Sequence, residues 1–81
     1  MNDTVVVYMQ AYNAEHTLRR ALDSMLNQTY RDWILYLVDN GSTDSTGNIA
    51  DKYAEMDSRI ICKHVFPNNF LYFHSFIATY L

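Results

Sequence analysis

The fold follows most directly from one segment of the chain, Trp33-Ile34-Leu35-Tyr36-Leu37-Val38-Asp39-Asn40-Gly41-Ser42-Thr43-Asp44. Its first half, up to Val38, is a continuous apolar run, which is typical of a strand buried on both faces in a parallel sheet. Its second half has the composition of a turn, and Ser42, Thr43 and Asp44 are each N-cap candidates for a following helix. The segment therefore predicts a junction between a buried strand and a helix.

A second junction of this kind lies earlier in the chain. Thr4 to Met9 is another continuous apolar run, and we predict a strand that is also buried on both faces. Asn13 is the predicted N-cap of the next helix, with Glu15 adding negative charge to its first turn. Apolar residues then recur at helical spacing, namely Leu18, Ala21, Leu22 and Met25. The helix should end near Asn27 and Gln28.

The pattern continues through a second helix and a third strand. The apolar side of the helix is marked by Ile49, Ala50, Tyr53 and Ala54. We expect this helix to end near Asp57, and a strand to run from Arg59 to Val65. The order β-α-β-α-β predicts an α/β fold with a parallel sheet and right-handed crossovers. We assign this unit to residues 1–65, and we expect residues 66–81 to form a divergent, aromatic-rich tail.

Composition excludes several classes of protein. The chain has 81 residues and a formal net charge of -3, with 6 scattered Lys and Arg residues. No basic surface for nucleic acid is therefore expected. Cys62 is the single cysteine, so no internal disulfide is possible, and a lone thiol suits a reducing compartment. We predict no signal peptide and no membrane-spanning helix, which would need about 18 or more apolar residues in a row.

Two loops are placed to bind a ligand. In an open parallel sheet, ligands bind at the carboxyl ends of the strands, where Gln10–Asn13 and Asp39–Asp44 lie. If the first two strands are neighbours, both loops border one crevice. The helix N-termini that follow them should present free backbone N–H groups, which suit anionic ligands.

Tyr12 and Asp39 are the candidate ligand contacts in this crevice. A tyrosine ring can stack on a nucleobase, a contact worth about 1–3 kcal/mol. A carboxylate can accept a hydrogen bond from a base imide N–H, worth about 1.5–3 kcal/mol. An aromatic face with one directional carboxylate would hold and identify a pyrimidine.

Structural roles for the same residues remain open. Tyr12 could be a half-buried packing residue, and Asp39 could cap a turn. Other ligand chemistry is less well supported. His16, His64 and His74 share no metal-ligand spacing and Cys62 reads as a core residue, so we predict no metal site. The sequence lacks the glycine-rich dinucleotide motif, the P-loop and the G-x-S-x-G nucleophile motif.

Several segments together resemble glycosyltransferase family 2. They are Val5-Val6-Val7-Tyr8-Met9-Gln10-Ala11-Tyr12-Asn13-Ala14-Glu15, Leu22-Asp23-Ser24-Met25-Leu26-Asn27-Gln28-Thr29-Tyr30, Val38-Asp39-Asn40-Gly41-Ser42-Thr43-Asp44 and Asp57-Ser58-Arg59-Ile60. They resemble the family's P-x-Y-N, S-[IVL]-L-x-Q-T-[YF], V-D-D-G-S-T-D and D-x-R-[IV] motifs, and they occur in the same order and at similar spacing. The resemblance covers residues 4–65. It implies part of a GT-A domain, which is Rossmann-like.

The resemblance also implies a function. Members transfer a sugar from a nucleotide diphosphate donor, often UDP, to an acceptor, usually with a divalent cation such as Mn²⁺ or Mg²⁺. Carried over residue by residue, Tyr12 would pack on the donor base and Asp39 would hydrogen-bond it. Ala11 would approach the nucleotide through its backbone. The candidate nucleotide-binding residues are therefore Ala11, Tyr12 and Asp39.

The chain departs from the family pattern at several positions. Gln10-Ala11 replaces the family's Pro-Thr, and Asn40 replaces the second acid of V-D-D. No D-x-D occurs anywhere in the sequence, so the ligands of the family's metal ion are absent. A catalytic base is likewise not identified. We therefore expect the chain to hold only the donor nucleotide-binding half of an enzyme, and to be inactive or nearly so alone. A truncated or frameshifted gene product would account for this.

Further expectations concern partners and alternatives. An isolated unit of this size leaves a parallel edge unpaired, so we expect marginal stability or self-association. Donors of this class are cytosolic, which implies a cytoplasmic location, with peripheral association at the inner membrane face for the full-length enzyme. One alternative is a non-catalytic nucleotide-binding or regulatory module. Another is a generic doubly wound α/β domain with an unrelated ligand.

Overall fold

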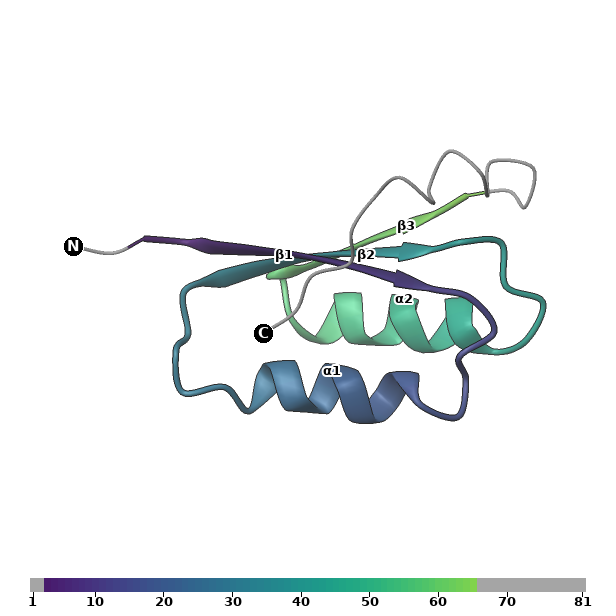
Figure 1. Cartoon of the computed structure of the whole chain (residues 1–81), viewed down its shortest axis with the longest axis horizontal. Helices are drawn as coiled ribbons and strands as arrows, with labels where there is room; N and C mark the ends of the chain where they lie inside the picture. Colours follow the sequence, from purple (N-terminus) through teal and green to yellow (C-terminus); the bar gives the residue numbers. More distant parts are fainter. Residues whose placement is uncertain (1–2, 66–81) are drawn as a thin grey trace.

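A computed structural model describes residues 3–65 of the chain (Figure 1). The elements are β1 (Val5–Ala11), α1 (Leu18–Leu26), β2 (Trp33–Asp39), α2 (Thr46–Met56) and β3 (Ile60–His64). The predicted order β-α-β-α-β is therefore confirmed, and so is the predicted α/β class. The predicted aromatic-rich tail, residues 66–81, lies outside the described residues.

The three strands form one parallel sheet in the order β1-β2-β3. The first two strands are neighbours, as the crevice hypothesis requires. At the carboxyl edge, Ala11 pairs in register with Asp39, and Asp39 pairs in register with His64. The loops after β1 and β2 consequently leave the sheet side by side.

Both helices lie on the same side of the sheet (Figure 1). This follows from the strand order, because two right-handed crossovers that step in the same direction along a sheet place both helices on one face. The core lies between these layers and consists of Val7, Leu18, Leu22, Met25, Trp33, Leu35, Leu37, Ile49, Ala50, Tyr53 and Ile60, with Ala11 at its edge. Most of the apolar residues whose spacing predicted the helices are buried, and the other two, Ala21 and Ala54, are partly buried.

The prediction that the strands are buried on both faces is wrong for the described part of the chain. The face away from the helices leaves Val6, Tyr8, Tyr36 and Ile61 between 37% and 49% exposed. Tyr8 and Tyr36 are register partners, and their rings stack with centroids 5.4 Å apart. The apolar runs predicted a sheet covered on both faces, whereas within residues 3–65 the two helices cover one face.

The helix ends differ in part from their predictions. α1 starts at Leu18 with Thr17 in the N-cap position, so the prediction that Asn13 caps it is wrong. The N–H groups of Thr17 and Leu18 bond the carbonyl of Ala14, which forms a separate turn before the helix. The end of α1 at Leu26 and the end of α2 at Met56 agree with the sequence pattern.

Three residues were predicted as N-caps of α2, and one of them, Asp44, accepts hydrogen bonds from the first residue of the helix. Its Oδ1 accepts hydrogen bonds from the N–H of Thr46, at 2.9 Å, and from the Thr46 hydroxyl, at 2.5 Å. Ser42 and Thr43 bond to Asn13 in the other loop instead. The cap prediction for these two residues is therefore wrong, and they join the two loops.

No helix within residues 3–65 combines the length and the apolar character needed to cross a membrane.

Candidate functional site

A backbone hydrogen bond joins the two loops at the carboxyl edge, at the point where they leave β1 and β2. The N–H of Asn40 donates a 2.8 Å hydrogen bond to the carbonyl of Ala11, which extends the β1–β2 pairing by one step. Ala11 itself is buried, at 6% exposure. Its backbone therefore lies in the sheet edge beneath the two loops.

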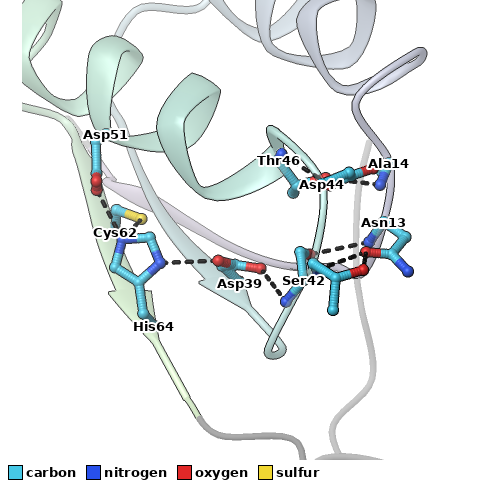
Figure 2. Close-up of polar contacts among 10 residues, drawn as sticks. Asn13, Ala14, Asp39, Ser42, Asp44, Thr46, Asp51, Cys62 and His64 are labelled. Atoms are coloured by element: carbon cyan, nitrogen blue, oxygen red, sulfur yellow. Dashed lines mark hydrogen bonds and ion pairs between the residues drawn. The ribbon is translucent and has the colours of Figure 1, made fainter.

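Asn13 joins the two loops further out (Figure 2). Its N–H donates to the hydroxyl of Ser42 at 2.9 Å, and its Oδ1 accepts from the N–H of Thr43 at 2.8 Å. Asn13 has φ of 47°, a left-handed conformation that Asn tolerates better than most residues. The backbone N–H and the side-chain oxygen of Asn13 thus each make one hydrogen bond across the two loops.

Acidic side chains accept hydrogen bonds from the backbone N–H groups at the start of α2. Asp44 bonds the N–H of Thr46, and its Oδ2 accepts from the N–H of Glu15 at 3.3 Å. Glu15 in turn accepts from the N–H of Ser45 at 3.1 Å. The N–H groups of Ser45 and Thr46 are therefore already bonded to carboxylates, so these two groups are not free as the sequence led us to expect.

The hydrogen bonds also affect the charge of Asp44. Desolvation acts to raise its pKa, but the bonds from Thr46 and from the backbone N–H of Glu15 outweigh it and hold the pKa below its ordinary value. Asp44 thus stays ionised and keeps its two loop partners.

Asp39 is buried, at 5% exposure, and both of its carboxylate oxygens are bonded within the protein. Oδ1 accepts from the N–H of Ser42 at 3.1 Å, which closes the turn after β2. Oδ2 lies 2.9 Å from Nδ1 of His64 (Figure 2). The turn-capping role left open from the sequence is therefore present. Because a carboxylate oxygen has two lone pairs, each can accept a further donor.

His64 lies between two carboxylates. Its Nε2 is 2.7 Å from Oδ1 of Asp51 in α2, and its Nδ1 faces Asp39. The hydrogen bonds to Asp51 and Asp39 raise the pKa of His64 above its ordinary value, against a smaller opposing effect of desolvation. A raised pKa favours the imidazolium form, in which the ring can donate to both acids.

Cys62 lies beside this group, with Sγ 3.7 Å from Nε2 of His64. Burial, together with the charges of Asp51 and Asp39, raises the pKa of the thiol to about 12. The side chain is partly buried and packs against the core, as its position in the strand predicted. It is therefore held as a neutral thiol.

The side chains of Asp51, Cys62 and His64 place three ligand-type atoms within 4.8 Å of one another. Histidine spacing alone did not indicate this group, because its members come from two elements that meet only in the folded chain. The 2.7 Å contact between Asp51 and His64 is a hydrogen-bond distance. The set offers one carboxylate with a thiol and an imidazole, whereas Mg²⁺ and Mn²⁺ prefer oxygen ligands.

Tyr12 and Asn40 also lie in the two loops. Tyr12 follows β1 directly and is 52% exposed, so its ring lies at the surface beside the two loops. Asn40, which stands where the family has an acid, is 2% exposed. No described residue supplies a hydrogen bond to its Oδ1. The structure thus brings Ala11 and Asp39 into register and leaves Tyr12 exposed directly after β1, while Asp51 and His64 were not identified from the sequence.

Comparisons with known proteins identify the family. The sequence profile described as glycosyl transferase family 2 matches residues 6–71. Glycosyltransferase GlyA of Streptococcus pneumoniae serotype 4 is 41% identical over 61 residues, which are 75% of this chain and 9% of that protein. The putative glycosyltransferase EpsE of Bacillus subtilis is 48% identical over 50 residues, which are 62% of this chain and 18% of that protein.

A third relative carries a more specific name. The UDP-Glc:alpha-D-GlcNAc-diphosphoundecaprenol beta-1,3-glucosyltransferase WfgD of Escherichia coli is 45% identical over 47 residues, which are 57% of this chain and 19% of that protein. The chain thus spans less than a fifth of the length of each of these three relatives. The profile match covers most of the chain, and it agrees with the parallel sheet and the paired loops. The chain belongs to glycosyl transferase family 2.

Proposed function

We propose that the crevice between the two loops binds the nucleotide of a sugar-nucleotide donor, and that the chain supplies the donor-binding part of a glycosyltransferase. The observation that carries the proposal is the register pair of Ala11 and Asp39 at the carboxyl edge, with Tyr12 directly beyond it. This edge is where parallel α/β sheets bind ligands. Uridine diphosphate is the proposed nucleotide, since the E. coli relative WfgD is named for a UDP-glucose donor.

Each candidate residue has a distinct role in this proposal. The Tyr12 ring stacks on the base, a contact worth about 1–3 kcal/mol. Asp39 accepts the imide N–H of uracil on a lone pair that its partners Ser42 and His64 leave unused. The backbone of Ala11 borders the nucleoside. Together these groups would recognise a pyrimidine by its face and by one edge.

The same loops do not favour the diphosphate. The N–H groups of Ser45 and Thr46 are bonded to Glu15 and Asp44, and those two carboxylates would repel phosphate oxygens. The described residues therefore suit the base and ribose end of the donor. The diphosphate would be held elsewhere in the complete enzyme.

A divalent cation, Mn²⁺ or Mg²⁺, is the proposed holder of the diphosphate in the longer proteins of this family. The residues of this chain do not fit it, because the sequence has no D-x-D and the described group Asp51, Cys62 and His64 offers a single carboxylate. We derive no step through the ion. We also propose a cytoplasmic location, where donors of this class are available, with peripheral binding at the inner membrane face for the longer enzyme.

Titration of the 81-residue chain with uridine diphosphate tests the proposal. Binding should be measurable by calorimetry or by amide chemical shifts, and Tyr12→Ala and Asp39→Asn should each weaken it about tenfold or more, or about 1.4 kcal/mol. Tyr30→Ala and Asp32→Asn are matched controls, because both residues lie at the opposite end of β2. Equal losses in the controls, or no binding by the wild-type chain, would refute the proposal.

The alternative of a non-catalytic nucleotide-binding or regulatory module uses the same crevice. Both hypotheses predict that the chain binds the nucleotide, but only the enzyme hypothesis predicts sugar transfer. A sugar-transfer assay with the full-length gene product separates the two, since the module would bind the nucleotide and transfer nothing.

A further inference from the structure

The carboxylate of Asp39 is held from two sides. Ser42 bonds Oδ1 from the turn after β2, and His64 bonds Oδ2 from the end of β3 (Figure 2). One hydrogen bond would still allow the carboxylate to rotate about its Cβ–Cγ bond. Two bonds, one to each oxygen, fix the plane of the group and therefore the direction of its remaining lone pairs.

We propose that His64 is a positioning residue, which orients Asp39 to receive the base of the nucleotide. The inference rests on the proposed role of Asp39 in nucleotide binding. His64 would act through Asp39 without contacting the nucleotide. Its own orientation comes from Asp51, whose Oδ1 lies 2.7 Å from Nε2 on the far side of the ring.

Packing around the pair supports a fixed geometry. Gly47, in the first turn of α2, lies so close that a Cβ there would be 2.8 Å from Oδ2 of Asp39 and 3.3 Å from Cε1 of His64. Real Cβ atoms do not approach other atoms within 3.0 Å. Because glycine has no Cβ, Gly47 leaves room for the hydrogen bond between Asp39 and His64.

The charges around His64 suit a double donor. Asp39 faces it from β2, Asp51 faces it from α2, and Cys62 lies beside it on β3 as a neutral thiol. An imidazolium can donate to both acids at once. A neutral imidazole has a single N–H, which the two carboxylates must share.

Two isosteric substitutions separate the two bonds. The amide nitrogen of Asn can take the place of Nδ1, and that of Gln can take the place of Nε2. His64→Asn should therefore keep the donor to Asp39 and bind uridine diphosphate within about threefold of the wild type, or about 0.7 kcal/mol. His64→Gln and His64→Ala lose that donor and should bind about tenfold more weakly, or about 1.4 kcal/mol.

A pH series gives a readout that a purely structural role would not affect. Uridine is the probe, because it carries no phosphate that titrates with His64. Its affinity should fall about twofold as the pH rises through the pKa of His64, since the neutral ring keeps its proton on Nδ1 in only part of the molecules. Asp51→Asn should move this fall to lower pH, and His64→Asn should abolish it.

His16→Asn is the matched control, because His16 is 92% exposed and its contact is with Glu15. Equal uridine diphosphate affinity in wild type, His64→Ala and His64→Gln would overturn the inference. If Asp39→Asn nevertheless abolished binding, the proposed function would stand. If the wild-type chain bound no nucleotide, both would fall. The Asn–Gln comparison holds even if His64→Ala unfolds, since both replacements are polar and remove the same ring.

Discussion

The side-chain oxygen of Asn13 accepts a 2.8 Å hydrogen bond from the N–H of Thr43, 30 residues further along the chain. This bond links the loop after β1 to the loop after β2. It is reinforced by the bond from the N–H of Asn13 to Ser42. The shape of the proposed crevice therefore depends on a contact between two segments that no local propensity would pair.

Substitutions at Asn13 should separate its two contributions. Asn13→Ala loses the acceptor for Thr43 and strains the backbone at φ 47°, so the free energy of unfolding should fall by about 2 kcal/mol. Asn13→Gly keeps the backbone conformation and should lose about 1 kcal/mol. Asn13→Asp keeps the acceptor and should stay close to the wild type. Urea unfolding measures all three, and equal stabilities for the Ala and Asp variants would contradict the account.

Gly47→Ala should weaken nucleotide binding although it improves helix propensity. Ala is favoured over Gly by about 1 kcal/mol in a helix, but overpacking costs about 1–3 kcal/mol, and here the new Cβ meets Oδ2 of Asp39. Displacing that carboxylate should reduce the affinity for uridine diphosphate about tenfold. Asn48→Ala, at the exposed neighbouring position, is the control. Unchanged affinity in Gly47→Ala would show that Asp39 tolerates the displacement.

Acid should remove the stabilisation that comes from Asp44 and Asp57. The hydrogen bonds from Arg59 lower the pKa of Asp57, and those from Thr46 and Glu15 lower the pKa of Asp44 despite desolvation. A lowered carboxyl pKa stabilises the folded state above the ordinary value of 3.8, and this contribution is lost as the pH falls through the folded value.

The measurement is urea unfolding from about pH 6 to about pH 2, where stability should fall steeply below about pH 4. Asp57→Asn should reduce the steepness of the fall. Glu55→Gln, on the exposed side of α2, is the charge-matched control. A pH profile of Asp57→Asn that matches the wild type would show that the Arg59 contact contributes nothing.

The sequence predicted the positions of the helices and strands better than it predicted which strand faces are buried. The apolar run ending at Val38 and the helical spacing from Leu18 to Met25 identified their elements correctly, because strand and helix periods are local properties. The run from Thr4 to Met9 gave no sign of which face is covered. That depends on the side to which each crossover turns, which is a property of the assembled sheet.

The candidate site shows the same division. Asp39 and Tyr12 were predicted as contacts because both lie in the loops that follow predicted strands, and the family motifs pointed to the same two residues. His64 and Asp51 were not found, because His64 lies 25 residues from Asp39 and 13 from Asp51. The register of β3 against β2 brings them together, and only a prediction of that register would have indicated the contact.

The sheet face away from the helices should mediate self-association of the 81-residue chain. Tyr8, Tyr36 and Ile61 are 49%, 37% and 43% exposed there, and the described residues leave this apolar surface uncovered. Sedimentation velocity over a concentration series should therefore show dimers or larger species. Tyr8→Lys and Ile61→Lys should each shift the chain toward the monomer, because a charge on an apolar interface must be desolvated. Met56→Lys is the control, since Met56 is 63% exposed but lies at the end of α2, away from this face. A wild-type chain that stays monomeric at every concentration would contradict the prediction, and so would an equal effect of Met56→Lys.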